Sequence, residues 1–175
     1  MSMIGCFRRV SKRSYDRLLA APESICEFLE KDGDPQAPEA EAFADLDIDK
    51  AWHGIHFLLT GSAWEGEAPL NFLVGGGQEI GEVDVGYGPA RGFTSAEVGA
   101  IARALREVPP AVLRARYDHS QLNRHEIYPF APDQWRAADD KEDSPTSFLG
   151  DHYERLREFI AQAAQAGEAL LVWLC

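Results

Sequence analysis

The chain has few cysteines, no long apolar run and few basic side chains, and each shortage excludes a class of protein. Its 175 residues include only Cys6, Cys26 and Cys175, with no CxxC pair and no zinc-like spacing. Such cysteines are typical of free thiols in a reducing compartment. No apolar run approaches the ~20 residues of a membrane span, and the apolar N-terminal segment is too short for a signal peptide. We therefore expect a soluble, cytoplasmic protein.

Acidic side chains dominate the charge. Seventeen Lys and Arg residues face twenty-nine Asp and Glu residues, which gives a formal net charge of −12. A field of this sign repels phosphate backbones and anionic headgroups but attracts a basic protein. We expect neither nucleic acid nor a membrane surface as a partner. The basic side chains near the N-terminus are expected to be solvated; they are Arg8, Arg9, Lys12, Arg13 and Arg17.

Motifs that would announce a reaction are missing. The sequence has no HExxH and no GxSxG pattern, and no GKS or GKT follows its glycines. Gly86-Tyr87-Gly88 is followed by Arg91 where a dinucleotide fingerprint requires glycine. We expect no bound metal and no cofactor, and whether the protein is an enzyme stays open.

Length and periodicity indicate one domain, spanning residues 1–175, of mixed helix and strand. A chain this long buries roughly 70% of the surface that its unfolded form exposes. The pattern predicts strands over 3–10, 69–74 and 169–174, helices beginning near 11, 22, 94, 110 and 148, and acidic loops over 32–42 and 137–147. The last strand has no polar alternation and should be central. Strands that alternate with helices favour a sheet sandwiched by helices.

The most distinctive segment, residues 46–61, predicts a helix with Asp47 or Asp49 at its start and Gly61 as its C-cap. At ~100° per residue, Trp52 lies in a broad apolar arc, while Asp49, His53 and His56 share a polar stripe. The stripe suits part of a metal site or acid/base work, with further ligands such as His119, His125 or His152 arriving by folding. The plainer interpretation, which we favour, has Asp49 capping the helix and the histidines facing solvent or satisfying a neighbouring carbonyl.

Glycine is concentrated between residues 75 and 92, where seven of the fifteen glycines lie. Two interpretations account for this: turns at positive φ around a strand connection, or a backbone cradle for a ligand. In the second, Tyr87 or Arg91 would grip an anion or stack on a ring. Arg91 is equally a salt-bridge partner for Asp84 or Glu82.

The run LDIDKAWHGIHFLLTG, residues 46–61, resembles the hallmark of the YfbM-like family, a domain of unknown function. Further runs agree with it: residues 3–5, 79–81, 84–91 and 127–129, and the closing helix with its apolar strand. The resemblance implies a compact α/β domain found in bacteria, a three-layer sandwich with helices on both faces of a mixed sheet. It implies no activity, cofactor or catalytic residue.

The sequence therefore leaves two functional hypotheses. The first is a non-enzymatic binding or protein-interaction module, for example of the immunity type, whose acidic surface attracts a basic protein. The alternative is a small-molecule-binding domain or an enzyme, with a pocket between the helix of the polar stripe and the 84–91 loop. The candidate ligand-binding residues are Asp49, Trp52, His53, His56, Asp84, Tyr87 and Arg91.

Overall fold

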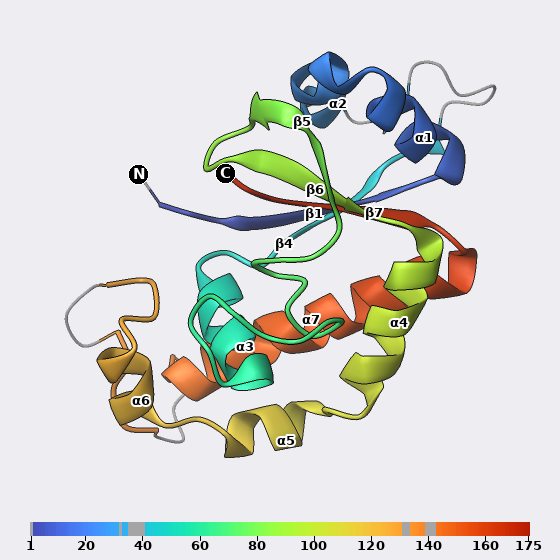
Figure 1. Ribbon diagram of the computed structural model, residues 1–175. Coiled ribbons are helices and arrows are strands. Elements are labelled where there is room, and N and C mark those ends of the chain that lie inside the picture. The colour runs from blue at the N-terminus through green and yellow to red at the C-terminus, as the bar shows by residue number, and fades with distance from the viewer. Residues whose placement is uncertain (1, 32, 35–40, 131–133, 139–142) are drawn as a thin grey trace.

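The computed structural model describes residues 2–31, 33–34, 41–130, 134–138 and 143–175 (Figure 1). They form an α/β fold with a five-stranded sheet in the order β4-β1-β7-β6-β5, and a separate pairing of β2 with β3. The strands are β1 (Gly5–Val10), β2 (Gly33–Asp34), β3 (Glu41–Ala42), β4 (Ala44–Asp47), β5 (Gln78–Asp84), β6 (Pro89–Phe93) and β7 (Ala169–Leu174). The described helices are α1 (Lys12–Ala20), α2 (Ile25–Glu30), α3 (Ala51–Thr60), α4 (Ser95–Arg106), α5 (Pro110–Ala115), α6 (His119–Arg124) and α7 (Pro145–Ala166), with a 3₁₀ turn at Pro22–Ser24.

The five-stranded sheet is antiparallel at each of its four pairings, so the expected mixed sheet is wrong. The reason is visible at β1 and β4, where Arg9 near the end of one strand pairs with Ala44 at the start of the other. The excursion through α1 and α2 leaves and rejoins the sheet at the same end, which forces the returning strand to run in the opposite direction.

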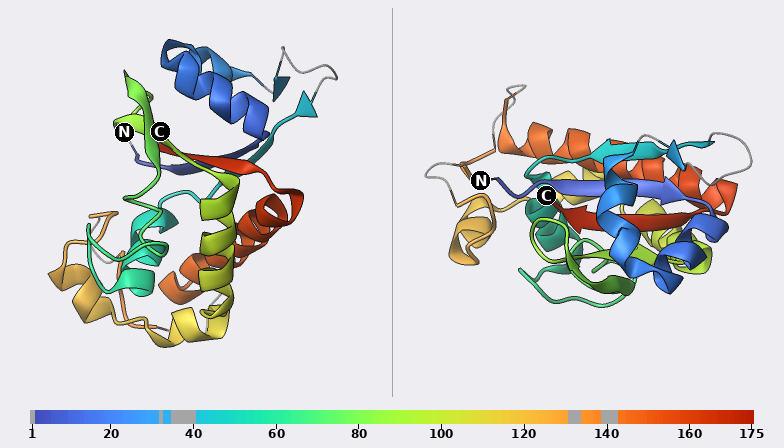
Figure 2. Two further views of the ribbon diagram at one scale, coloured as in Figure 1. Left: turned by 45° about the vertical axis from the view of Figure 1, so that its right-hand side comes forward. Right: turned by 90° about the horizontal axis from the view of Figure 1, so that it is seen from above.

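Strand β7 is central and covered on both faces, as its apolar run predicts. Leu170 and Val172 enter one hydrophobic core, while Ala169 and Leu171 enter the other. Figures 1 and 2 show α1 and α2 over one face of the sheet and α3, α4 and α7 against the opposite face. The larger core lies on the α3 side, and it is this side that builds the candidate site.

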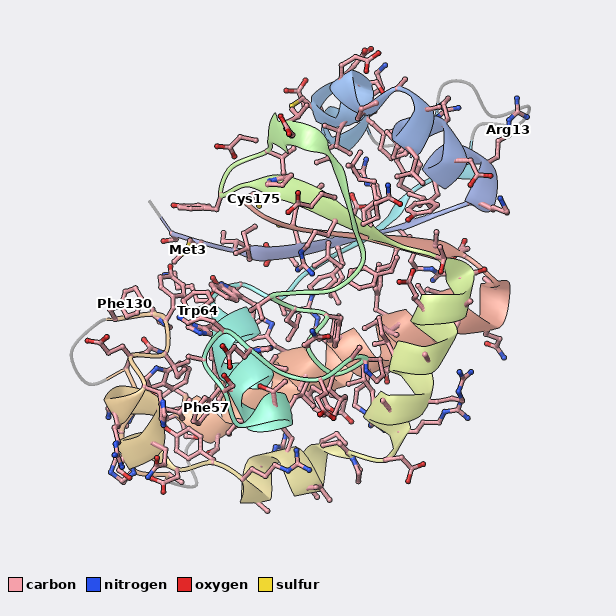
Figure 3. All side chains as sticks on the ribbon, in the orientation of Figure 1. Met3, Arg13, Phe57, Trp64, Phe130 and Cys175 are labelled. Carbon is pink, nitrogen blue, oxygen red and sulfur yellow. The ribbon has the colours of Figure 1, made fainter. Side chains whose placement is uncertain are left out.

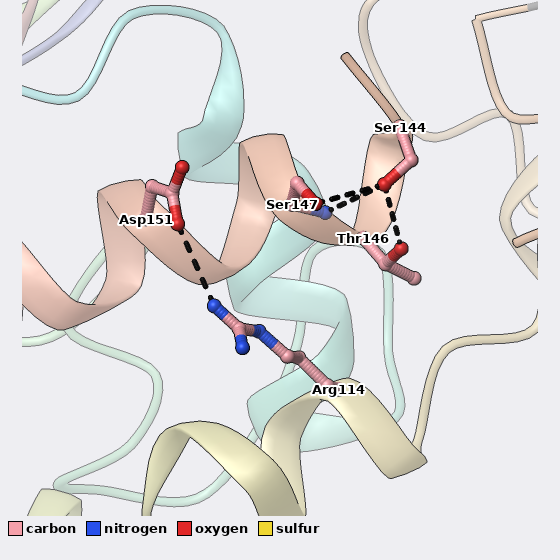
Figure 4. Close-up of polar contacts among 5 residues, drawn as sticks. All are labelled: Arg114, Ser144, Thr146, Ser147 and Asp151. Carbon is pink, nitrogen blue, oxygen red and sulfur yellow. Dashed lines mark hydrogen bonds and ion pairs between the residues drawn. The ribbon is translucent and has the colours of Figure 1, made fainter. Parts of the chain in front are cut away.

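Local capping signals place most of the helices. Thr94 and Glu97 form a reciprocal capping box at the start of α4, as predicted. Ser144 caps α7, its Oγ accepting from the Ser147 backbone N–H at 3.1 Å (Figure 4). Gly167 ends that helix in the left-handed conformation. The same view shows Arg114 of α5 reaching Asp151 of α7 at 3.5 Å. Helix α7 therefore begins at Pro145, three residues before the predicted start.

Two segments differ from the sequence expectation. The helix expected over 46–61 begins only at Ala51, because Ala44–Asp47 pairs with β1. Leu46 and Ile48 are buried with exposed Asp47 between them, an alternation that suits a strand. Residues 69–74, expected as a strand, form turns instead.

The acidic loops are described only in part. In the first loop, Gly33–Asp34 pairs with Glu41–Ala42 as two short strands. The sequence had predicted no regular backbone pairing there. Residues 32 and 35–40 of that loop, and 139–142 of the second, lie outside the described residues.

Arg8, expected to be solvated, is buried. Its guanidinium donates to both carboxylate oxygens of Asp45, at 2.7 and 2.6 Å, and to the carbonyl of Phe28. Burial of this charge is tolerated because it is paired and hydrogen-bonded. Among the helices described, none is long and apolar enough to cross a membrane.

Candidate functional site

The segment from residue 61 to residue 77, here called the anchored loop, joins α3 to β5 without a helix or strand of its own. Connections longer than ~12–15 residues without regular structure are uncommon and are usually functional. Gly61 begins the loop in the left-handed conformation, as predicted for a C-cap, and donates to the Phe57 carbonyl at 2.7 Å. Three candidate residues from the sequence hold this loop.

His53 links α3 to two other segments. Its Nδ1 accepts from the Tyr128 backbone N–H at 2.9 Å, so the ring proton lies on Nε2, which donates to the Ala63 carbonyl at 2.7 Å. The ring is fully buried and stacks on Trp52 at 4.8 Å between centroids. Burial lowers the pKa of His53, which keeps it neutral in this role.

His56 anchors the loop one turn further along α3. Its Nε2 donates to the Glu65 carbonyl at 3.0 Å, while its buried Nδ1 has no hydrogen-bond partner among the described residues. Burial, with smaller contributions from His53 and Arg91, lowers the pKa of His56 to about 4. The solvent-facing interpretation of both histidines is therefore wrong, and the alternative, in which they satisfy neighbouring carbonyls, is what the structure shows.

Arg91 of β6 holds the other end of the anchored loop. Its Nη1 donates to the carbonyls of Phe72 at 3.0 Å and Gly76 at 3.2 Å as well as to Gly75, and its Nη2 donates to Leu73 at 2.9 Å. Burial lowers its pKa to about 10, which still leaves it charged at neutral pH. The partners of this guanidinium are therefore loop carbonyls. The sequence had instead suggested a bound anion, or a salt bridge to Asp84 or Glu82.

The remaining four candidates have other roles. Asp49 does not cap α3: it stands before Lys50, the N-cap, and has a positive φ of 46°. Trp52 is buried, and its indole N–H donates to the Met3 carbonyl at 3.1 Å.

Asp84 is the last residue of β5 and Tyr87 lies in the β5–β6 turn, at the opposite end of the hairpin from the Arg91–Glu79 pair. Asp84 Oδ1 accepts from the backbone N–H groups of Gly86 at 2.8 Å and Gly88 at 3.0 Å, which lowers the pKa of this carboxyl. Gly86 has a φ of 147°, and a Cβ there would meet the Leu174 carbonyl oxygen at 2.8 Å. These glycines therefore serve the turn interpretation, and Tyr87 stands exposed on it.

The anchored loop presents one aromatic side chain to solvent beside another from the 125–130 segment. Trp64 is 58% exposed and Phe130 64% exposed, although aromatic residues of this size are usually core. Ring contacts join them through the interior: Trp64 to Trp52 at 6.1 Å, Trp52 to Tyr128 at 5.8 Å, and Tyr128 to Phe130 at 5.5 Å. Figure 3 shows Trp64 and Phe130 at the same side of the molecule, with Met3 close by. We call Trp64, Tyr128 and Phe130 the aromatic edge.

Acidic side chains accompany the aromatic edge. Glu65 and Glu67 follow Trp64 along the loop, and Glu126 precedes Tyr128; all three are exposed. Arg124 of α6 is the nearest exposed cation along the chain in that segment. Along the chain next to the aromatic edge, exposed acidic side chains therefore outnumber basic ones.

A pocket of about 280 Å³ lies between the anchored loop and α4. Pro69 and Gly77 of the loop, Phe93 of β6 and Ile101 of α4 line it, with Glu97 as its charged group. None of the seven candidates is among the described residues that line it. Within the part of the chain that the structure describes, no group of three or more His, Cys, Asp or Glu side chains is placed to hold a metal.

Comparison with known proteins identifies the family. A model described as a domain of unknown function, DUF1877, matches residues 1–173. The chain belongs to the DUF1877 family. Its fold is similar to that of a crystal structure described as a protein of unknown function, YfbM from Escherichia coli, with a TM-score of 0.67 and 22% identity over 99% of this chain and 100% of that one. Among curated proteins, none matches.

The YfbM-like resemblance of the sequence is thus confirmed. Sequence reasoning did not single out Trp64 or Phe130 as site residues, because large aromatic side chains are usually expected to pack in the core. A signal was present, since Trp64 lies in a polar, glycine-containing stretch, GSAWEGE, with no apolar periodicity. A large apolar side chain without an apolar partner at helix or strand spacing indicates exposure.

Proposed function

We propose that this DUF1877 protein is a non-enzymatic interaction module that docks a basic segment of a partner protein on its aromatic edge. The observation that carries the proposal is that the two most exposed aromatic side chains are the ends of one connected ring cluster. Exposed apolar surface of this kind marks interaction sites, and aromatic residues are enriched there.

Charge complementarity selects the partner. Glu65, Glu67 and Glu126 are exposed and lie within three positions of Trp64 or Tyr128 in the sequence, on a chain of net charge −12. An arginine or lysine over the face of Trp64 or Phe130 would gain about 0.5–2 kcal/mol from the ring quadrupole. Neighbouring carboxylates would add attraction that weakens with salt.

The anchoring contacts supply rigidity. The loop backbone is held by hydrogen bonds from the neutral rings of His53 and His56 and from the charged guanidinium of Arg91. Trp64 is therefore presented from a fixed backbone. A preorganised surface loses less conformational entropy when a partner binds. The same proposal has two further parts. The two groups of helices form the outer layers of a three-layer arrangement. The protein works in the cytoplasm, which its free cysteines favour.

The test is a titration with a fluorescein-labelled peptide of alternating arginine and leucine, followed by anisotropy. Trp64→Ala and Phe130→Ala should each weaken binding about tenfold, the effect of losing a central aromatic contact. Val112→Ala, which removes an exposed apolar side chain on α5, is the matched control and should bind as the unmodified protein does. Equal affinity for a peptide with glutamate in place of arginine, or unchanged affinity in both aromatic variants, would contradict the proposal.

A second candidate function is small-molecule binding in the pocket of about 280 Å³ beside the loop. Its apolar lining with one carboxylate suits a small apolar ligand that carries a donor or a positive charge. Ala100 lines the pocket, so Ala100→Phe should fill it. A panel of small amines would be screened by thermal shift: stabilisation that Ala100→Phe abolishes supports this function, and no stabilisation counts against it.

A further inference from the structure

Two cysteines that are distant in the sequence lie in contact. The sulfurs of Cys6 and Cys175 are 2.6 Å apart, although 169 positions separate the residues along the chain. Strand pairing explains the approach: Ile4 and Cys175 exchange both backbone hydrogen bonds, at 2.8 and 3.1 Å, and Cys6 pairs with Trp173. Cys6 and Cys175 are therefore diagonal neighbours on one face of the sheet, because side chains two residues apart in a strand share a face.

We propose that Cys6 and Cys175 form a reversible disulfide when the protein meets a low-molecular-weight disulfide such as oxidised glutathione. Both thiols are free in this structure. Closing the bond would require the sulfurs to approach by less than ~1 Å.

The surroundings assign an order to the two steps. Cys175 is exposed, whereas Cys6 is half-buried beside β4. Burial, the contact with Cys175 and the negative charges of Asp47 and Asp45 raise the pKa of the Cys6 thiol. Since the thiolate is the nucleophile, Cys175 attacks first and Cys6 resolves.

The exchange balances without a further reagent. The Cys175 thiolate attacks one sulfur of oxidised glutathione, which forms a mixed disulfide and releases one glutathione thiolate. Cys6 gives up its proton to solvent, and its sulfur attacks the Cys175 sulfur and releases the second glutathione. The two cysteines lose two electrons and two protons, and oxidised glutathione gains them as two molecules of the thiol.

The bond would fix the chain where β1 and β7 meet the β5–β6 turn. The Tyr87 backbone N–H donates to the Leu174 carbonyl at 3.2 Å, so the β5–β6 turn rests on the residue before Cys175. Figures 1 and 2 show the start of β1 and the end of β7 side by side. Oxidation would therefore tie β1 to the strand end that supports the turn bearing Tyr87.

Cys26 provides an internal control, because it is an exposed cysteine on α2 with no described sulfur neighbour. The native protein would be incubated in a glutathione redox buffer, quenched with acid, alkylated and mapped by mass spectrometry without reduction. We expect a peptide linking Cys6 to Cys175, a mass lower by two hydrogens, and one alkylated thiol at Cys26. Dithiothreitol should restore all three thiols.

Variants separate this disulfide from general thiol oxidation. Cys26→Ser should form the link to the same extent, whereas Cys6→Ser should instead retain glutathione on Cys175. The proposal is overturned if the unmodified protein gives no linked peptide, if Cys6 and Cys175 carry separate glutathiones, or if the link joins two chains.

Discussion

The buried imidazole of His56 makes the stability of the protein depend on pH in a defined window. The folded state holds the pKa of His56 at about 4, compared with 6.5 for a free histidine, mainly because of burial. Between these values the unfolded chain binds a proton that the folded chain does not. The contribution of His56 to the free energy of unfolding is therefore fully present above about pH 6.5, and it is lost as the pH drops towards 4.

The size of the effect follows from proton linkage. Between about pH 7.5 and about pH 5, this one site should lower the free energy of unfolding by about 2 kcal/mol. That is a large share of the roughly 5–15 kcal/mol that stabilises a typical domain. His53, whose pKa is also lowered by burial, acts in the same direction.

Urea unfolding at the two pH values, followed by circular dichroism, measures the loss. His56→Gln isolates the site, because a glutamine amide can still donate towards the Glu65 carbonyl but does not ionise. The variant should lose about 2 kcal/mol less than the unmodified protein over this interval. His125→Gln, which removes an exposed imidazole, is the control and should behave as the unmodified protein does.

Equal losses in His56→Gln and the unmodified protein would refute the reasoning, since His56 would then accept a proton within the fold. The same question can be put without a variant by following the His56 ring signals in an NMR titration. They should not titrate between about pH 7.5 and about pH 5.5 while the protein stays folded.

Two further predictions concern the loop and the packing of α3. Arg91→Met leaves four loop carbonyls without their hydrogen-bond donor. A low dose of protease should therefore cleave the anchored loop at least about tenfold faster than in the unmodified protein. Arg103→Met, at an exposed arginine of α4, is the control and should leave the cleavage rate unchanged. Gly54→Ala would place a Cβ 2.7 Å from the nearest side-chain atom and should cost about 1–3 kcal/mol in urea unfolding. Gly99→Ala, also within a helix but 3.5 Å from its nearest neighbour, should instead stabilise by about 0.5–1 kcal/mol; a loss as large as that at Gly54 would contradict the packing described here.

Much of the fold could be predicted from local signals. The capping box at Thr94, the left-handed glycines Gly61 and Gly167, and the apolar run of β7 each carry their structure within a few residues. The strand directions could not be predicted in this way. They depend on where a helical excursion rejoins the sheet, and nothing in a local pattern determines that.

The segment 46–49 shows how long-range pairing overrides a local pattern. Leu46 and Ile48 fit the apolar arc of a helix and equally the inward face of a strand. Pairing with β1 selects the strand, and the positive φ of Asp49 separates it from α3. A helical projection alone cannot supply the partner strand.

The sequence singled out His53, His56 and Arg91 as ligand-binding candidates, and in the structure all three donate to carbonyls of one loop. Their role depends on carbonyls at Ala63, Glu65 and in the 72–76 segment, whose positions follow from the path of the loop. An irregular path has no period, so no sequence pattern placed those carbonyls in advance.

The most direct test of the docking proposal is a two-dimensional NMR titration of the labelled protein with the arginine–leucine peptide. The indole N–H signal of Trp64, assigned with a Trp64→Phe variant, should shift together with the backbone signals near Phe130. Signals of the groove between α4 and α7 should stay in place, since two of the three charged side chains that line it, Arg103 and Arg106 but not Glu158, are cationic and disfavour a basic peptide. Shifts confined to the groove, or a Trp64 signal that does not move at saturating peptide, would contradict the account.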